Sequence, residues 1–475
     1  MNTQDTICAI ATAQGGAIGI IRISGQNAIS IANKIFTPAG EKKISLADRP
    51  ANSITFGLIK DKTNDVIDEV LVSLFRKPHS YTGEDSVEIS CHGSSYILQK
   101  VMQLLIENGC RAAGPGEYTQ RAFLNGKMDL SQAEAVADLI ASTSAATHRM
   151  AMNQMRGGFS RELYLLREKL LHLTSLIELE LDFSDHEELE FADRKELKKI
   201  ANQVETVICN LVNSFSMGNA LKNGIPVTIV GETNAGKSTL LNTLLNEERA
   251  IVSDIHGTTR DIIEDTIILE GITFRFIDTA GIRKTTDAIE TIGIERSFKK
   301  LSQASIVMWV IDATCAEIQY NQLSGQILPR CKGKHLIIVL NKSDLLSEET
   351  KNTLSNKKSN ISIFKNLPDG SFIIPLSAKN KTGIHELQKQ LIDYTTLPDI
   401  SQNDVVVSNI RHFEALTHAH DAILRVIKNI DAQISGDLIS EDLRQCIFHL
   451  AEIVGGEITT DEVLGNIFKH FCIGK

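Results

Sequence analysis

The stretch GETNAGKS, Gly231 to Ser238, decides the fold of this part of the chain. It matches the pattern G-x-x-x-x-G-K-[ST] and stands between the strand pattern PVTIV and the helical pattern STLLNTLL. Glycines let backbone N–H groups wrap phosphates, and the N-terminus of the following helix adds a positive dipole. The stretch therefore predicts a phosphate-binding loop, in which Lys237 reaches the β- and γ-phosphates and Ser238 binds Mg²⁺.

Two motifs that follow in chain order predict the rest of the magnesium and γ-phosphate site. In GTTRD, residues 257 to 261, Thr259 is placed to complete the Mg²⁺ shell. DTAG, residues 278 to 281, follows the strand pattern FRFI, so Asp278 stands at a strand end and supports the ion behind its direct ligands. The N–H of Gly281 is placed to meet the γ-phosphate.

NKSD, residues 341 to 344, predicts that the base is guanine. Asp344 can accept hydrogen bonds from guanine N1–H and the exocyclic amine, whereas adenine would leave this carboxylate unpaired. The backbone of SAK, residues 377 to 379, can support the guanine carbonyl oxygen. A GTP site follows, with a domain that binds GTP without hydrolysing it as the alternative. The predicted contacts are Asn234, Ala235, Gly236, Lys237, Ser238, Thr239, Thr259, Asp278, Thr279, Ala280, Gly281, Asn341, Lys342, Asp344, Ser377, Ala378 and Lys379.

The residue after DTAG is Ile282, where many small GTPases have a glutamine that orients the attacking water. The side chain of isoleucine cannot do this. One alternative is an arginine in the same chain, Arg283 or Arg260, that supplies charge to the transition state. The other is a monovalent cation held by Asn234 and by carbonyls of the loop before GTTRD, with Glu290 orienting the water. Taken alone, Glu290 is more simply explained as an exposed helix acid.

Composition narrows the class of protein. The 475 residues include 49 basic and 59 acidic side chains, a net charge of −10, which argues against gripping nucleic acid by bulk electrostatics. Eight scattered cysteines without a C-x-x-C pair favour a reducing compartment. The start, MNTQDTICAI, lacks a basic segment, so no signal peptide is expected, and no apolar run reaches the roughly 18 residues of a membrane helix. We expect a cytoplasmic protein.

Periodicity predicts four segments. Residues 1–125 contain short strands (ICAIAT, GIIRIS, VEIS), residues 126–222 are helical, residues 223–385 alternate apolar strands with helices, and residues 386–475 are helical again. The alternation indicates a parallel sheet with crossover helices. The simplest architecture is a helical domain interrupted by an inserted α/β domain. The acidic stretch DFSDHEELEFADRKEL is interpreted as a solvated helix start or loop, with a metal site as the lesser alternative.

The whole chain resembles the MnmE (TrmE) family of tRNA-modifying GTPases. The resemblance rests on GGAIGIIRISG, YTGEDSVEISCHG, PGEYTQRAFLNGKMDLSQAEAVADLI, the nucleotide motifs and the final FCIGK. The expected fold class is multidomain α/β and α. It would combine an N-terminal α+β folate-binding-like domain with a helical domain interrupted by a Ras-like P-loop GTPase domain.

The resemblance implies a potassium-dependent hydrolysis. Potassium would replace the arginine finger, held by Asn234, Ser253, Ile255 and Thr258, and Ser253 and Thr258 would also border the nucleotide. Mg²⁺ would be held by Ser238 and Thr259. Glu290 would be catalytic and orient the water. The GTPase domains of two chains would pair when GTP and K⁺ are bound.

For the N-terminal domain, the resemblance implies folate binding and homodimer formation. Arg22, Glu88 and Lys127, with Lys475, would contact a methylene- or formyl-tetrahydrofolate. From the residues alone, charged groups in or near apolar strands need partners. A folate could be such a partner, but so could the opposite charges of surface salt bridges. In FCIGK, Cys472 is the fourth residue from the end, the position of a prenylated cysteine, but Gly474 and Lys475 fit a prenylation motif poorly. The resemblance instead makes Cys472 essential for modification.

The resemblance implies a heterotetramer with the flavoprotein MnmG, acting on tRNA. The pair would add an aminomethyl or carboxymethylaminomethyl group at C5 of the wobble uridine of certain tRNAs. Two alternatives remain open. One is a GTPase switch in ribosome assembly, and the other is a GTP-regulated, folate-dependent aminomethyltransferase that acts on a protein or a small molecule.

Overall fold

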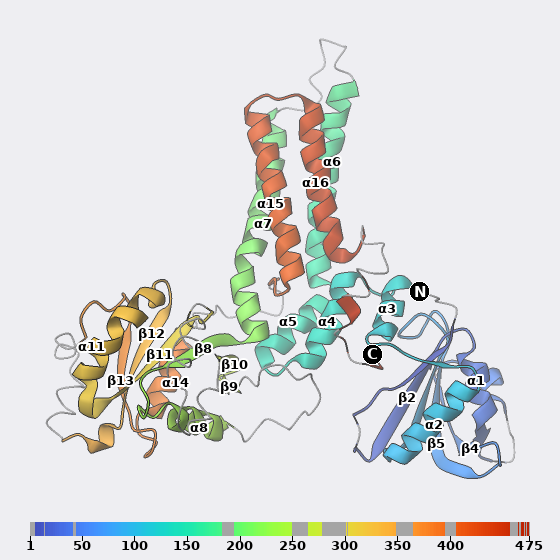
Figure 1. Ribbon diagram of the computed structural model, residues 1–475. Helices are drawn as coiled ribbons and strands as arrows, with labels where there is room; N and C mark the ends of the chain where they lie inside the picture. Colours follow the sequence, from blue (N-terminus) through green and yellow to red (C-terminus); the bar gives the residue numbers. More distant parts are fainter. Residues whose placement is uncertain are drawn as a thin grey trace. The chain divides into compact units, whose positions relative to one another are not determined.

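The computed structural model describes most of the chain, in two compact units (Figure 1). Unit one comprises Met1–Ala141, Ala151–Val212 and Ile410–Lys475, and unit two comprises Ser142–Met150 and Asn213–Asn409. Within the described residues, no helix combines the length and the apolar character that crossing a membrane requires. The described residues are 5–13, 15–40, 44–182, 194–248, 265–277, 301, 303–347, 364–394, 405–456, 464, 467–469, 471 and 473–474.

Unit one begins with a seven-stranded sheet in the order β3-β4-β5-β6-β2-β1-β7. All its pairs are antiparallel except β1 with β7. Helices α1 (Ala28–Ile35) and α2 (Ser95–Glu107) cover one face and share its core. The strands are β1 Ile7–Ile10, β2 Ile18–Ser24, β3 Phe36–Pro38, β4 Ser53–Lys60, β5 Val66–Phe75, β6 Ser86–His92 and β7 Arg111–Ala112, with a 3₁₀ turn η1 Leu46–Asp48.

The strands of this sheet alternate as the sequence predicts. In β5, Val70, Val72 and Leu74 are buried against the helices, because successive side chains point to opposite faces. Leu71 points to the other face and is exposed. The predicted strands GIIRIS and VEIS are confirmed within β2 and β6, and the predicted strand ICAIAT is confirmed over its first four residues, which form β1.

The rest of unit one is helical. Four long helices, α6, α7, α15 and α16, lie side by side, and α16 packs against both α15 and α6. Their apolar residues recur at helical spacing and face inward, as in α15, where Leu416, Ala419, Ile423 and Val426 are buried. The helices are α3 Glu117–Leu124, α4 Leu130–Ala141, α6 Gly158–Asp182, α15 Ile410–Asp431 and α16 Gly436–Val454. Helices α5 Ala145–Met155 and α7 Arg194–Asn223 belong partly to unit one and partly to unit two.

Unit two is a six-stranded sheet in the order β13-β12-β11-β8-β10-β9, in which only β9 runs antiparallel to its neighbour. Helices α8 and α14 pack on one face and α11 on the other. The elements are β8 Ile225–Val230, α8 Lys237–Glu248, β9 Asp265–Leu269, β10 Ile272–Ile277, β11 Ile306–Asp312, η2 Ala313–Cys315, α11 Ala316–Ile327, η3 Leu328–Cys331, β12 His335–Asn341, η4 Ser343–Leu345, β13 Phe372–Pro375 and α14 Ile384–Asp393.

Every strand expected for this unit is present, and the multidomain α/β and α fold class is confirmed. Strand β11 shows why its sequence, IVMWVID, is apolar throughout: Met308 packs into the core under α8 and α14, whereas Trp309 packs under α11. The acidic stretch falls largely on residues 183–193, outside the described residues.

Candidate functional site

The predicted phosphate-binding loop joins the end of β8 to the start of α8. Gly231 has φ +147° and a Cβ atom there would lie 2.1 Å from the carbonyl oxygen of Val310. Gly236 has φ +94°, and its Cβ would lie 2.1 Å from Nδ2 of Asn341. Both positions therefore require glycine, because the backbone passes too close to its neighbours for any side chain. Between them, Asn234 has φ +63° and is exposed at the tip of the loop.

The side chain of Lys237 lies over this loop. Its Nζ donates to the carbonyl oxygens of Gly231 (2.9 Å) and Glu232 (2.7 Å). Burial lowers the pKa of Lys237, and the nearby charge of Glu232 opposes part of that shift. An ammonium group held in this way is positioned above the backbone N–H groups that would receive the β- and γ-phosphates. Ser238 and Thr239 follow in the first turn of α8.

Asn341 connects the three predicted segments of the nucleotide site. Its Nδ2 donates to the carbonyl oxygen of Ala235 (2.8 Å), and its Oδ1 accepts from the backbone N–H of Ala378 (3.0 Å). The side chain is only 3% exposed. Both ends of the amide are thus used within the protein, and its role is to hold the phosphate loop against the SAK turn. Thr243 strengthens the same junction by donating to the carbonyl oxygen of Ala378 (3.1 Å).

The expected guanine-reading segment lies at the carboxyl end of β12. Lys342 has φ +62°, and its Nζ pairs with Oδ2 of Asp312 at 2.6 Å. Burial raises the pKa of Asp312, but hydrogen bonds from Lys342 and Thr314 outweigh that effect and lower it. Asp344 is exposed on η4. Sequence reasoning missed Asp312, although an aspartate that ends a buried strand beside the nucleotide motifs was a signal for it.

The structure brings together the predicted residues of the phosphate loop, NKSD and SAK, from Asn234 to Lys379. Ser377 and Ala378 are buried at the turn, and Lys379 is exposed. The remaining predicted residues of this site lie outside the described residues and stay predictions. They are Ser253, Ile255, Thr258, Thr259, Arg260, Asp278, Thr279, Ala280, Gly281, Ile282, Arg283 and Glu290.

A second candidate site lies in unit one, on the sheet face opposite α1 and α2. Arg22 of β2 and Glu88 of β6 are direct cross-strand partners. The Nε and Nη2 atoms of Arg22 lie 2.9 and 2.8 Å from Oε1 of Glu88. Both side chains are about one quarter exposed, at 22% and 25%. A ligand can therefore contact both side chains without any rearrangement that exposes them.

Two tyrosines flank the Arg22 guanidinium. The ring centroids of Tyr81 and Tyr118 lie 5.6 and 5.7 Å from its Cζ atom, within the range of cation–π contact. The Tyr118 hydroxyl donates to the backbone carbonyl of Arg22 (2.7 Å), and burial raises the pKa of both tyrosines. Sequence reasoning missed both residues, although they stand in the quoted YTGEDSVEISCHG and PGEYTQ stretches.

The C-terminal segment docks beside this pair. Ile473 forms an antiparallel bridge with Pro115, and the carbonyl oxygen of Gly474 accepts from Nη1 of Arg22 at 3.3 Å. A Cβ at Gly474 would lie 2.6 Å from the carbonyl oxygen of Ile10, so the tail is closely packed. Cys472 and Lys475 lie outside the described residues, and their predicted roles stay predictions.

Lys127 is placed differently from the other predicted folate contacts. It is exposed, and its Nζ donates to the carbonyl oxygen of Pro78 at 2.9 Å. Asn125 donates to the carbonyl oxygen of Thr82, so this turn is attached to the loop that carries Tyr81. Among the described residues, Lys127 makes no hydrogen bond or ion pair with Arg22 or Glu88.

Buried ion pairs hold the helices around this second site. Arg121 of α3 is 3% exposed and pairs with Asp5 (2.6 Å), Glu117 (3.0 Å) and Glu84 (3.3 Å). Burial raises the pKa of Glu117, but hydrogen bonds from Arg111, Gly114 and Arg121 outweigh it and lower that pKa. The network fixes α3, and with it Tyr118.

A further buried cluster joins α4 to the start of α15. Glu134 pairs with Arg411 (3.0 Å) and His412 (2.6 Å), and Arg411 also donates to the carbonyl oxygens of Glu452 and Ile453 at the end of α16. Burial alone would raise the pKa of Glu134, but His412 and Arg411 lower it to about 2. The carboxylate is thus charged across the whole physiological range.

Comparisons with known proteins cover the whole chain. The family model described as the GTP-binding protein TrmE N-terminus matches residues 6–127, and the model of the MnmE helical domain matches residues 130–472. A protein of Bacteroides fragilis (strain YCH46) is 64% identical over 472 residues, covering 99% of this chain and 100% of its own length. A protein of Phocaeicola vulgatus is 60% identical over 508 residues and covers 100% of both. Each carries the name tRNA modification GTPase MnmE.

Proposed function

This chain belongs to the MnmE family of tRNA modification GTPases, and we propose that it is a K⁺-dependent GTPase that works with the flavoprotein MnmG. The pair adds an aminomethyl or carboxymethylaminomethyl group at C5 of the wobble uridine of certain tRNAs. The observation that supports nucleotide binding in this proposal is the junction made by Asn341, whose side chain bonds both the phosphate loop at Ala235 and the SAK turn at Ala378. Relatives with this name share the full length of the chain.

In the hydrolysis step, the described residues bind and orient the nucleotide. The loop from Gly231 wraps the phosphates with its N–H groups, Lys237 neutralises their charge, and Asp344 selects guanine. Ser238 and Thr259 would hold Mg²⁺. The exposed side-chain oxygen of Asn234 suits a K⁺ ion beside the phosphates, with Ser253, Ile255 and Thr258 as its further ligands. Glu290 would orient the attacking water that Ile282 cannot.

The Arg22–Glu88 pair supports the folate part of the proposal. A tetrahydrofolate derivative, when bound, supplies the one-carbon unit. Its pterin donors suit the Glu88 carboxylate, its glutamate carboxylate suits a cation such as Arg22, and the rings of Tyr81 and Tyr118 suit its flat heterocycle. Lys127 and Lys475 would bind the same molecule, and Cys472 would take part in the modification beside it.

Homodimer formation is supported by an uncovered apolar row on the same sheet face. Ile54 and Phe56 of β4 are 68% and 49% exposed, and Leu71, the direct cross-strand partner of Phe56, is 47% exposed. A contiguous exposed apolar row on a sheet marks an interaction surface. We propose that a second copy of the chain covers it.

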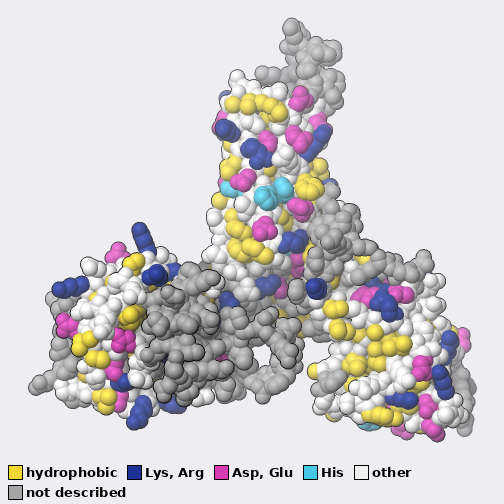
Figure 2. All heavy atoms as spheres, viewed as in Figure 1, with side chains coloured by type: hydrophobic (Ala, Val, Ile, Leu, Met, Phe, Trp, Pro, Cys, Tyr) yellow, Lys and Arg dark blue, Asp and Glu magenta, His cyan; other side chains and the backbone are white. Residues whose placement is uncertain are grey.

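The surface charge is consistent with sharing the tRNA between partners. On the face drawn in Figure 2, Lys and Arg side chains lie among Asp and Glu side chains, and the net charge of the chain is −10. A surface of mixed sign binds phosphates weakly in bulk. We therefore propose that MnmG makes many of the contacts that bind the tRNA.

The first test is GTP turnover by the purified chain in matched KCl and NaCl. We expect stimulation by K⁺ of at least about tenfold, because a charge at the finger position contributes strongly to the transition state. Glu290→Ala should abolish turnover in both salts. Glu317→Ala, which removes an exposed glutamate of α11, is the matched control and should behave as the wild type. Equal rates in both salts would transfer the role to Arg283 or Arg260.

The second test is the wobble nucleoside profile of tRNA modified by the chain with MnmG. Cys472→Ser should eliminate the modified nucleoside and leave GTP turnover intact, whereas Cys315→Ser, a half-buried cysteine of η2, should change neither. An unchanged profile in Cys472→Ser would remove this cysteine from the reaction. Co-sedimentation with ribosomes and unaltered tRNA nucleosides would instead support the assembly switch.

A further inference from the structure

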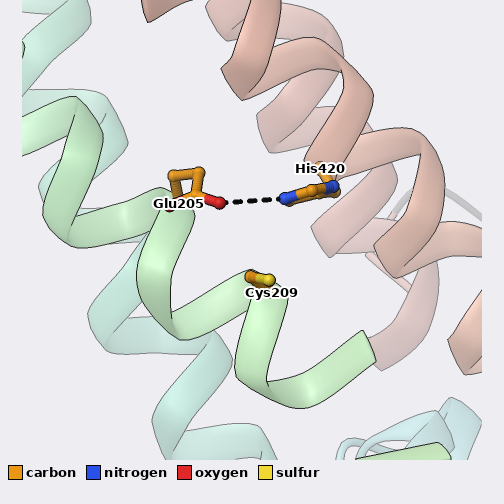
Figure 3. Close-up of side chains that lie close together, drawn as sticks. All are labelled: Glu205, Cys209 and His420. Carbon is orange, nitrogen blue, oxygen red and sulfur yellow. Dashed lines mark hydrogen bonds and ion pairs between the residues drawn. The ribbon is translucent and has the colours of Figure 1, made fainter. Parts of the chain in front are cut away.

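Three side chains with metal-binding atoms meet on the bundle of long helices (Figure 3). Glu205 and Cys209 are four residues apart on α7, so they lie on one face of that helix, and His420 faces them from α15. One ligand atom from each residue lies within 4.8 Å of the other two. Each residue is half-buried, so solvent reaches the group. Histidine side chains are visible at the surface of this bundle in Figure 2.

We propose that Glu205, Cys209 and His420 form a binding site for a borderline-soft divalent cation, with Zn²⁺ as the ion that fits best. Thiolate, imidazole and carboxylate are the three side-chain ligands that Zn²⁺ uses in proteins. Bond lengths of about 2.0–2.3 Å place two ligand atoms of a tetrahedral ion about 3.3–3.8 Å apart. Side-chain rotations that move the ligand atoms by about 1 Å would bring them from within 4.8 Å of one another to this separation. A water molecule can supply the fourth ligand.

The charges of the site also balance. A thiolate, a carboxylate and a neutral imidazole around a divalent cation sum to zero, so a half-buried position does not leave a net charge away from water. The thiol proton, and any proton on the imidazole, would pass to solvent when the ion binds. Oε1 of Glu205 and Nε2 of His420 already lie 3.1 Å apart, close to the separation that two ligands of one ion would have.

A helix–helix ion pair uses only Glu205 and His420, whereas a metal site would also use the thiol of Cys209, one turn along α7. The chain offers an internal comparison in α16, where His449 and Glu452 make a similar contact at 2.9 Å. No cysteine completes that pair, and among the described residues the Glu205 trio is the one group of this kind. The third ligand is therefore the feature that distinguishes a metal site from a salt bridge.

The position of Glu205, Cys209 and His420 indicates that a bound ion would stabilise the fold. Helix α7 leads along the chain into unit two, and α15 is the first helix after unit two. An ion held by both helices would cross-link the two segments of unit one that flank the inserted unit. Because it binds the folded chain and not the unfolded chain, it would raise the melting temperature.

The test uses the full-length chain, stripped with a chelator and titrated with Co²⁺ and then Zn²⁺ without nucleotide. We expect one Co²⁺ per chain with a thiolate-to-metal charge-transfer absorption, displaced by Zn²⁺. Cys209→Ser should remove that absorption, and His420→Gln should weaken Zn²⁺ binding by at least about tenfold. The controls Cys315→Ser and His449→Gln should bind as the wild type does.

A charge-transfer absorption that survives in Cys209→Ser, or a wild-type chain that binds no Co²⁺, would overturn the proposal. Helical circular dichroism of each variant shows whether it is folded. Should Cys209→Ser not fold, Glu205→Gln decides, since its amide keeps the hydrogen bond to His420 and loses the carboxylate. Zn²⁺ should raise the melting temperature of the wild type and of Cys315→Ser, but not of Glu205→Gln.

Discussion

The nucleotide end of unit two and the Arg22 site of unit one are built by different means. The phosphate loop is shaped by close backbone approach, since a Cβ atom at Gly231 or at Gly236 would lie only 2.1 Å from a neighbouring atom. The Arg22 site is instead assembled by an ion pair, aromatic contacts and hydrogen bonds, one of which joins segments as far apart as Arg22 and Gly474. The first tolerates almost no change of shape, whereas the second depends on charge.

The largest effect should come from breaking the backbone approach. Gly231→Ala forces a Cβ against the Val310 carbonyl at a strained φ, and we expect it to cost about 4 kcal/mol and to abolish GTP binding. Trp309, the only tryptophan of the chain, is buried in unit two, so its fluorescence in a urea titration reports this unfolding.

Gly325→Ala is the matched control for this prediction. Gly325 lies in α11, and a Cβ there would meet nothing within 4 Å. Alanine at this helical position should stabilise the unit by about 0.5–1 kcal/mol. If both variants shifted the urea midpoint of the Trp309 fluorescence change in the same direction, the close approach of the Gly231 backbone to Val310 would not determine the shape of the loop.

Charge dependence in unit one should be next in size. The Glu134 pKa is lowered from its usual 4.5 to about 2, so its contribution is complete above pH 4.5 and is lost as pH falls toward 2. The shift corresponds to about 3 kcal/mol. Glu134→Gln should remove a similar amount at pH 7 and flatten the pH dependence of unfolding between pH 4.5 and 2, followed by helical circular dichroism.

Glu178→Gln serves as the exposed counterpart. Glu178 pairs with Arg444 at 2.9 Å, but its side chain is 45% exposed. Water screens such a pair, so the change should stay within about 0.5 kcal/mol. Equal effects of the Glu134 and Glu178 substitutions would mean that burial adds nothing to the ion pairs of unit one.

The prediction with the smallest expected effect concerns ligand binding at the Arg22 site. Arg22→Ala removes the Glu88 pair and the contact to Gly474, and it should weaken the binding of formyl-tetrahydrofolate about tenfold, or about 1.4 kcal/mol. GTP affinity should not change. Arg76→Ala, which removes a half-exposed arginine bonded to Ala47 and Arg49, is the control. Unaltered folate binding in Arg22→Ala would exclude this arginine from the site.

The same difference explains what the sequence could predict. The phosphate loop, NKSD and SAK are contiguous motifs whose strand and helix context is local, so their residues could be named in advance. The contact of Arg411 with Glu134 spans 277 positions. Glu134 stands in one of the quoted stretches, but nothing in the sequence pairs it with Arg411. Tyr81 and Tyr118 stood in recognised stretches, but nothing in their spacing placed both rings on Arg22.

The interruption of unit one by unit two also sets an order of events during synthesis. Helix α6 packs against α16, whose residues are made only after the whole stretch 213–409 has been synthesised. At about 5–20 residues per second, those 197 residues take roughly 10–40 s. Unit two can complete its sheet in that interval, while the apolar faces of α4, α6 and the start of α7 wait for their partners. The nascent chain is therefore most exposed to aggregation, and most in need of chaperones, just before α15 and α16 emerge.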